Sequence, residues 1–384
     1  MTLALTDVSL RRRARWHTLA AGVIAAWMLT GLGLMVSGAS WWAVVHPFTL
    51  GALSTAVIVY STHFTEALTR TPADSFGPVA TRVGILQVAI LLLLFGEAGP
   101  GWFWPADVGA GLTLVVLAWH GLALGRRLRR SLAGSVVVTV HFYLVAAGFL
   151  AVAVLLAWLA GRGIGDYDLL IAAHSRATVW GWTWLTVLGT IITLLPTLTG
   201  ARISPLARAR CPRALTVHAG GLLAAVAALL LDAPHLAAVF LLVTVVAAGM
   251  LVQPVWSQVL AGTRWRAAGL GVMAGVWWML ALAATDAVLI ARGTDPRVAL
   301  RLLVPALLGA GLLQLVTSVL LHLVPILRGH RPGADPTGPA RLSLINLGGL
   351  ATLLAPGPTG LILLALGLGG QLFALIGSLR KDTP

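Results

Sequence analysis

"IAAHSRATVWGWTWLTVLGTIITLLPTLTGAR", residues 171–202, is apolar along almost its whole length, yet it holds His174 and Arg176 near its start and Pro196 near its end. About 20 mainly apolar residues in a helix are enough to cross the hydrocarbon core of a bilayer. Charged or titratable side chains in such a helix are costly and usually face the interior of a helix bundle. This stretch therefore predicts a membrane-spanning helix with a polar site near one end.

The composition extends this prediction to the whole chain of 384 residues, of which 58% are hydrophobic and 10% are charged. An ordinary soluble domain is far less apolar. The first apolar run lacks a small-residue cleavage site after it, so we expect a retained span and no removed signal peptide. We predict one all-α integral membrane domain over residues 1–384. Its twelve predicted spans lie near residues 17–37, 43–65, 83–98, 106–124, 134–160, 169–197, 214–231, 235–254, 266–291, 300–327, 342–356 and 360–379.

The distribution of basic residues predicts the orientation of the chain. A net charge of +14 would suggest nucleic acid as the partner of a soluble protein. With the N-terminus inside, however, all but five of the 26 basic residues fall on the inner side, as the positive-inside rule requires. We therefore expect a bilayer and no nucleic acid, with both termini cytoplasmic. The five exceptions are Arg162, Arg176, Arg292, Arg297 and Arg301.

Three long segments resemble one another and indicate an internal repeat. They are "VVHPFTLGALSTAVIVYSTHFTEALTR", the segment quoted above, and "RLLVPALLGAGLLQLVTSVLLHLVPILRG". His46 and His174 are 128 residues apart, whereas Gly51 and Gly181 are 130 apart, so the register is defined to within about two residues. We predict three four-helix units, at roughly residues 1–130, 131–260 and 261–384, where a major-facilitator transporter would have two six-helix halves.

Twelve helices in three groups of four resemble the catalytic subunit of the haem-copper oxidase superfamily and its NnrS-type relatives. The local match is closest from His174 through Gly181 and Gly189 to "LLPTLTG", which ends at Gly200, and "HLVP" beginning at His322 repeats its closing element. "LGALSTAVIVYSTHF" and "GWTWLTVLGTIITLLPTLTGAR" are also similar to the membrane portion of bacterial, mainly actinobacterial, copper oxidases. The specific part of this resemblance covers about fifty residues.

The metal ligands of the oxidases are not all matched. Their H-x-x-x-Y, His pair and H-x-H motifs hold two haems and a copper, but here Arg176 replaces the second His of H-x-H, and the seventh predicted span holds only His218. A full oxygen-reducing binuclear centre is therefore not expected. The resemblance implies a haem- and/or copper-binding protein of a bacterial cytoplasmic membrane. It also implies electron transfer, or copper or nitrogen-oxide handling, with an extracytoplasmic multicopper oxidase or nitrite-reductase-like partner.

His46 and His174 are the predicted ligands of this cofactor, near the outer ends of the second and sixth spans. Neutral imidazoles bind haem iron and copper. Arg176 would neutralise a haem propionate or another bound anion through its planar guanidinium. The alternative is that both histidines are interfacial residues at helix starts, which Pro47 favours for His46 because proline suits a first helical turn.

A second, inner metal site would comprise His63, His141 and His322, with His120 or His218 as a further candidate ligand. These histidines would alternatively form hydrogen bonds between helices, or a proton path with Glu66. Asp286, in the ninth predicted span, has Arg292 as its simplest partner, with a proton-carrying or ligand-binding role as the alternative.

Two other functions remain open. The same helices would serve a transporter of copper or a small solute, or a structural subunit without cofactors. The sequence assigns no catalytic residue, and its single cysteine excludes a disulfide framework and a thiolate metal cluster.

Overall fold

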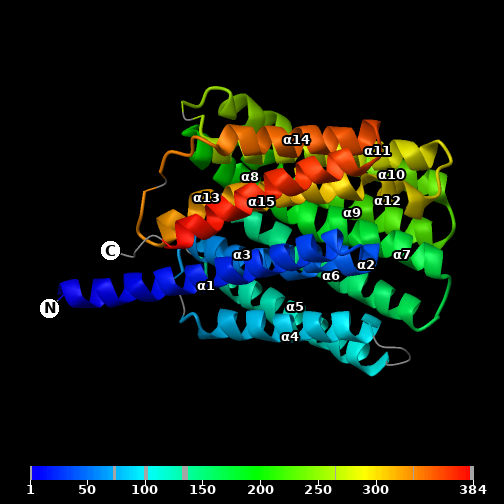
Figure 1. The fold of residues 1–384 in the computed structure, drawn as a ribbon, viewed down its shortest axis with the longest axis horizontal. Helices are drawn as coiled ribbons and strands as arrows, with labels where there is room; N and C mark the ends of the chain where they lie inside the picture. The colour runs from blue at the N-terminus through cyan, green and yellow to red at the C-terminus, as the bar shows by residue number, and fades with distance from the viewer. Residues whose placement is uncertain are drawn as a thin grey trace. The chain divides into compact units, whose positions relative to one another are not determined.

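The computed structural model describes residues 2–71, 75–98, 103–131, 137–263, 265–331 and 333–380, and all regular elements in these ranges are helical (Figure 1). The all-α prediction is therefore confirmed for these residues. In chain order the elements are α1 (Thr2–Val36), α2 (Trp41–His46), η1 (Pro47–Leu53), α3 (Ser54–Thr69), α4 (Gly77–Ala98), α5 (Phe103–Arg129), α6 (Val138–Gly161), α7 (Tyr167–Arg176), η2 (Ala177–Thr183), α8 (Trp184–Thr199), α9 (Pro205–Leu230), α10 (Pro234–Val259), α11 (Ala267–Ala291), α12 (Pro296–Ala306), η3 (Leu307–Leu313), α13 (Gln314–Leu327), α14 (Gly338–Leu354) and α15 (Pro358–Arg380). The elements named η are π-helices.

Eleven helices in the described ranges are long and apolar enough to cross a membrane. They indicate a multi-pass protein in a lipid bilayer, as the composition predicts. The remaining predicted span, 342–356, falls on α14, which has 17 residues and is shorter than the other eleven.

Three of the spanning helices differ from the rest in length and burial. Trp41–Thr69, Tyr167–Thr199 and Pro296–Leu327 have 29, 33 and 32 residues, and 67%, 78% and 72% of their apolar windows is buried. In the other eight spans the buried share is 33 to 56%, as expected of helices with one face toward lipid. Protein therefore surrounds these three helices on most sides, and an internal site is best placed on them.

Each of these three helices contains a seven-residue π-helical segment, a rare element that often occurs at functional sites. The segments begin at residues 47, 177 and 307, so successive starts are 130 residues apart. Their fifth residues are Gly51, Gly181 and Gly311. A Cβ atom on Gly181 would lie 2.5 Å from Phe149 Cβ, so the absence of a side chain lets α6 approach η2 closely.

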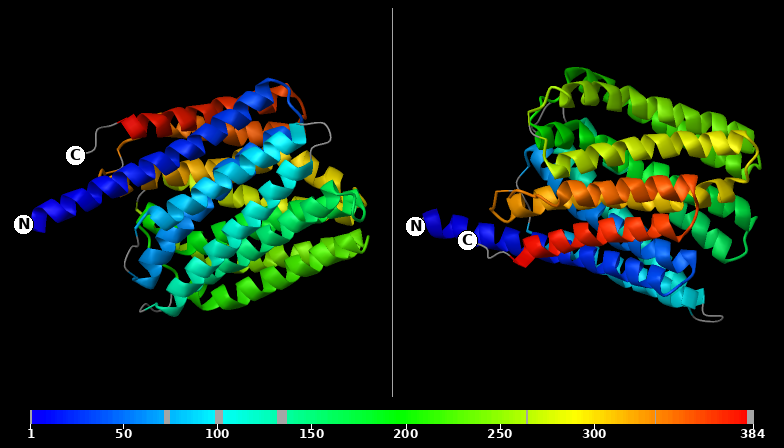
Figure 2. Two further views of the ribbon diagram at one scale, coloured as in Figure 1. Left: turned by 90° about the horizontal axis from the view of Figure 1, so that it is seen from below. Right: turned by 45° about the horizontal axis from the view of Figure 1, so that its top comes forward.

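The helices form two compact units. The first comprises Met1–Ala56, Arg264–Trp278 and Pro305–Pro384, and within it α14 packs along α15 (Figure 2). The second comprises Val57–Thr263 and Met279–Val304, and within it α4 packs along α5 and α9 along α10. These boundaries differ from those of the predicted repeats, and the repeat remains a prediction here.

Candidate functional site

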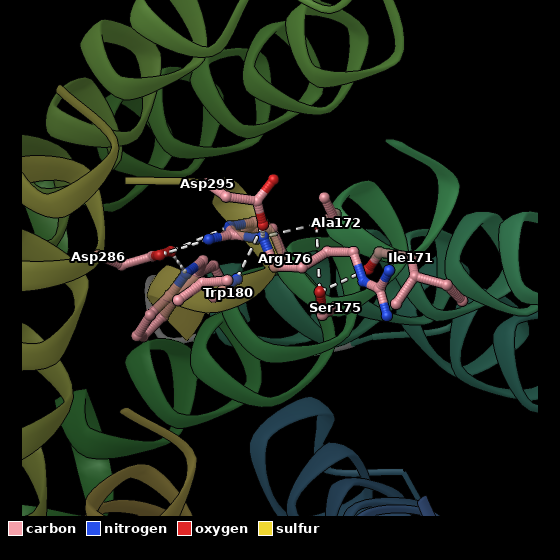
Figure 3. Close-up of polar contacts among 9 residues, drawn as sticks. Ile171, Ala172, Ser175, Arg176, Trp180, Asp286 and Asp295 are labelled. Carbon is pink, nitrogen blue, oxygen red and sulfur yellow. Dashed lines mark hydrogen bonds and ion pairs between the residues drawn. The ribbon is translucent and has the colours of Figure 1, made fainter. Parts of the chain in front are cut away.

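Arg176 and Asp286 form an ion pair in the interior of the second unit (Figure 3). Arg176 is the last residue of α7, and Asp286 lies on α11. Arg176 Nη2 is 2.5 Å from Asp286 Oδ1, and Arg176 Nε donates to Asp286 Oδ2 at 3.1 Å. Both side chains are 0% exposed. Because two parallel hydrogen bonds join the groups, this is the strong two-point form of an arginine–carboxylate contact.

Two further hydrogen bonds complete the surroundings of this pair. Trp180 Nε1 donates to Asp286 Oδ2 at 3.1 Å, and Arg176 Nη1 donates to the Ala172 carbonyl at 3.3 Å. Residues four apart on a helix are neighbours on its surface. This spacing explains why Arg176 reaches the Ala172 carbonyl and why Arg176 and Trp180 both contact Asp286. A buried ion pair is tolerated when such additional hydrogen bonds satisfy its remaining polar atoms.

The expected pairing of Asp286 with Arg292 is wrong. Arg292 directly follows the end of α11 and is exposed, whereas the partner of Asp286 is Arg176, 110 residues earlier in the chain. At about 100° per residue, side chains six positions apart on a helix point about 120° apart. Asp286 points into the protein, so Arg292 points elsewhere.

Local sequence explains where α7, the helix of Arg176, begins. Asp166 caps its N-terminus, since Asp166 Oδ1 accepts hydrogen bonds from the backbone N–H groups of Asp168 and Leu169 at 2.8 and 2.9 Å. Gly163 and Gly165 precede this cap with φ of 66° and 85°, values that favour glycine. The turn therefore ends α6 and starts α7 within a few residues.

His174 is half-buried, and its Nδ1 lies 2.8 Å from the Ala153 carbonyl oxygen of α6. A carbonyl oxygen only accepts, so Nδ1 carries the hydrogen, and in a neutral ring the lone pair is on Nε2. This arrangement, with a carbonyl fixing the tautomer, is typical of histidines that bind metals through the other nitrogen.

His46, the other predicted outer ligand, is held in the same way. Its Nδ1 lies 2.7 Å from the Trp42 carbonyl oxygen, and its ring stacks on Trp42 with centroids 4.2 Å apart. His46 belongs to the first compact unit and His174 to the second. That the two imidazoles share one cofactor remains a prediction.

The three predicted inner ligands have different surroundings. His141 is exposed on α6, whereas His63 on α3 and His322 on α13 are half-buried. In the ranges that the structure describes, no group of three or more His, Cys, Asp or Glu side chains could hold a metal ion. The inner metal site remains a prediction.

His218, on α9, was considered as a further ligand of the inner metal site, and the structure places it in the interior of the protein. Its Nε2 is 3.0 Å from the Trp180 carbonyl oxygen and its Nδ1 is 3.2 Å from the Thr244 carbonyl oxygen. A neutral imidazole has one N–H, so it donates to one of these oxygens at a time. His218 thus joins η2 to α10 beside the indole that contacts Asp286.

Glu66, considered for a proton path, is paired near the end of α3. Its Oε1 is 2.8 Å from Arg127 Nη2 of α5. His120, also on α5, is fully buried, with Nε2 3.0 Å from Ser61 Oγ. Neither contact was predicted, because the sequence does not show which helix faces are in contact.

Within a few turns of η2, the second unit therefore holds the fully buried Arg176–Asp286 pair, the His174 imidazole with a fixed tautomer and the bridging His218 imidazole. This arrangement can position a metal-binding nitrogen or a polar ligand without leaving a buried charge unmatched. A scan of protein-family models and a search of curated proteins found no match to the chain.

Proposed function

We propose that the chain is a haem- and/or copper-binding membrane protein of the haem-copper oxidase-like group. In this proposal it transfers electrons, or handles copper or nitrogen oxides, with an extracytoplasmic multicopper oxidase or nitrite-reductase-like partner. The observation that carries the proposal is the contact of His174 Nδ1 with the Ala153 carbonyl. It leaves Nε2 as the metal-binding atom of a ring whose orientation is fixed.

The architecture we propose is three four-helix units. Supporting it, the π-helical segments start at residues 47, 177 and 307, each in the second long helix of its unit. In this register of 130 residues the position directly before each segment is occupied by His46, Arg176 and Ala306. The segments also lie in the longest and most buried spans, where a cofactor would be shielded from lipid.

Each residue has a definite task in this proposal. His174 offers Nε2, and the Ala153 carbonyl holds the ring in one tautomer. The Arg176–Asp286 pair fixes the turn of α7 that carries His174, two residues away. A bound haem or copper would supply one-electron chemistry. Because Asp286 already matches the charge of Arg176, we give Arg176 a positioning role, and its contact with a haem propionate remains a prediction.

The experiment compares His174→Asn with the purified full chain. An asparagine amide can keep the hydrogen bond to the Ala153 carbonyl but does not replace Nε2 as a metal ligand. We expect the unsubstituted protein to contain haem or copper by visible spectroscopy and metal analysis. The variant should lose most of that content, or change the spectrum of the reduced form, while keeping its melting temperature. His235→Ala is the control, because His235 is an exposed histidine at the start of α10.

The proposal would be contradicted if the unsubstituted protein were colourless and free of copper even when the cells are grown with added copper and haem precursor. Equal cofactor content in His174→Asn and the unsubstituted protein would show that His174 is not a ligand of the cofactor. His46→Asn tests the other predicted ligand in the same assay.

Transport is the second candidate, and the fully buried Arg176–Asp286 pair favours it, because ionisable residues within membranes often mark a substrate pathway. Flux of copper or a small solute into proteoliposomes, abolished in Asp286→Asn, is the result that this candidate requires. If the protein contains no cofactor and carries no solute, the remaining hypothesis is a structural subunit without cofactors.

A further inference from the structure

The long helix α1 of the first compact unit extends past the end of its neighbour α15 (Figures 1 and 2). Residues 17–36 of α1 contain no charged side chain, and a helix of this length spans about 30 Å, the thickness of a hydrocarbon core. The headgroup layer adds about 5 to 8 Å on each side of the core. Arg15 and Arg12 precede residue 17 by about 3 and 8 Å along the axis, so they lie at the level of the headgroups.

Three arginines of this segment carry charge that no described residue matches. Arg12, Arg13 and Arg15 are exposed, and none of them has an ion pair, a hydrogen bond from its side chain or a ring contact within the ranges that the structure describes. Arg11 is also exposed, but it has another interaction and is not counted here. Asp7 is the one acidic residue in the sequence of α1. The helix therefore has an excess of positive charge at this level, which favours an anionic partner.

The burial pattern of α1 shows in which direction these arginines point. Its buried positions recur at helical spacing and form one face against the other helices. Between residues 14 and 28 they are Ala14, His17, Ala20, Ala21, Ile24, Ala25 and Met28, which are at most 4% exposed. At about 100° per residue, Arg12 and Arg15 point about 150° away from the centre of this face, and Arg13 lies about 50° from it. Arg12 and Arg15 therefore face lipid and not the protein.

The spacing of Arg12 and Arg15 suits a phosphate group. Residues three apart on a helix are neighbours on its surface, so both guanidinium groups can reach one headgroup. The planar guanidinium binds phosphate oxygens through paired hydrogen bonds. Trp16 directly follows this pair, and tryptophan is typical of the boundary between headgroups and hydrocarbon. Basic residues beside a membrane span attract anionic lipid headgroups.

We propose that Arg12 and Arg15 bind the phosphate of an anionic phospholipid on the lipid-facing side of α1, and that Arg13 adds positive charge at the edge of this site. The lipid carries a net negative charge, as phosphatidylglycerol does. Phosphatidylcholine fits less well, because its own choline cation neutralises its phosphate. The proposal does not depend on the proposed redox function.

The test measures which lipid lies beside α1 in the full chain, reconstituted into vesicles. Leu19 is 60% exposed and lies one turn after Arg15 on the same side, and the native Cys211 is buried. A fluorophore attached to the thiol of Leu19→Cys therefore reports on this site. The probes are phosphatidylglycerol and phosphatidylcholine that carry a nitroxide near the headgroup, since a nitroxide quenches only a nearby fluorophore. At equal mole fraction, we expect phosphatidylglycerol to quench more strongly.

Removing the two charges should remove this preference. Arg12→Gln with Arg15→Gln should lower the relative affinity for phosphatidylglycerol about 25-fold, the loss expected for two arginines near a charged headgroup, and high salt should also lower it. The matched control is Arg292→Gln with Arg301→Gln, which removes two exposed arginines of the second unit and should leave the preference unchanged.

Two results would overturn the proposal. One is equal quenching by the two lipids when Arg12 and Arg15 are present, and the other is an equal loss of preference in the control. Arg12→Lys with Arg15→Lys keeps both charges and should retain most of the preference, so an equal loss with lysine and with glutamine would also contradict a site built on charge. Because both arginines are exposed, all these variants should keep the melting temperature of the unsubstituted protein.

Discussion

Arg176 and Asp286, 110 residues apart in the chain, neutralise each other inside the protein, with two hydrogen bonds between side chains that are 0% exposed. An isolated charge in such surroundings would cost several kcal/mol because it has lost its water. The pair therefore joins α7 to α11, and either residue without the other would be an unmatched charge in the interior of the protein.

Breaking this pair should destabilise the protein strongly. Asp286→Ala leaves the Arg176 guanidinium and the Trp180 indole without their acceptor, and we expect a loss of about 3 to 5 kcal/mol of unfolding free energy. The measurement is equilibrium unfolding in mixed detergent, followed by tryptophan fluorescence.

The double variant Arg176→Met with Asp286→Leu is the control for this prediction. It removes both charges and fills a similar volume, so it should recover most of the lost stability. If the double variant is no more stable than Asp286→Ala, the loss comes from packing and not from an unmatched charge.

An exposed ion pair of the same chemistry should matter far less. Asp107 of α5 pairs with Arg162, next to the C-terminal end of α6, where the two side chains are 29% and 35% exposed. Solvent screens such a pair, so Asp107→Ala should cost less than about 1 kcal/mol. High salt should shrink the difference between this variant and the unsubstituted protein in unfolding experiments. A cost as large as that of Asp286→Ala would mean that lipid headgroups exclude water from the pair.

Gly181 should be intolerant of any side chain. A methyl group there would lie 2.5 Å from Phe149 Cβ, an atom attached directly to the backbone of α6 and unable to move aside. We expect Gly181→Ala to cost about 1 to 3 kcal/mol through overpacking. Gly148→Ala, on the same helix as Phe149 with nothing within 4 Å, should be neutral or slightly stabilising. Equal melting temperatures for the two variants would show that η2 can shift without cost.

The sequence predicted the helices well because hydropathy is a local property. The predicted span 169–197 corresponds to Tyr167–Thr199, and the predicted span 235–254 to Pro234–Val259. The π-helical segments were missed, since hydropathy does not distinguish π from α. Their one sequence signal was the 130-residue spacing of Gly51 and Gly181, which Gly311 continues.

The candidate site was predicted only in part. His174 and Arg176 were identified as polar residues in an apolar helix, and both have defined interior contacts. The partner of Asp286 was not identified, because it depends on helix rotation and on contacts between distant segments. Sequence alone fixes neither.

His218 provides the last prediction. Its ring lies between the carbonyl oxygens of Trp180 and Thr244, so it links α9 to both η2 and α10. His218→Leu removes the donor and leaves a buried acceptor unsatisfied, which should cost about 1 to 3 kcal/mol in the same unfolding experiment. His218→Gln keeps one donor and should recover part of the loss. His141→Leu is the control, because His141 is exposed on α6 and its loss should leave stability unchanged. If His141→Leu instead lowers bound copper, the inner metal site gains support, whereas a stable His218→Leu variant would mean that water satisfies both carbonyl groups.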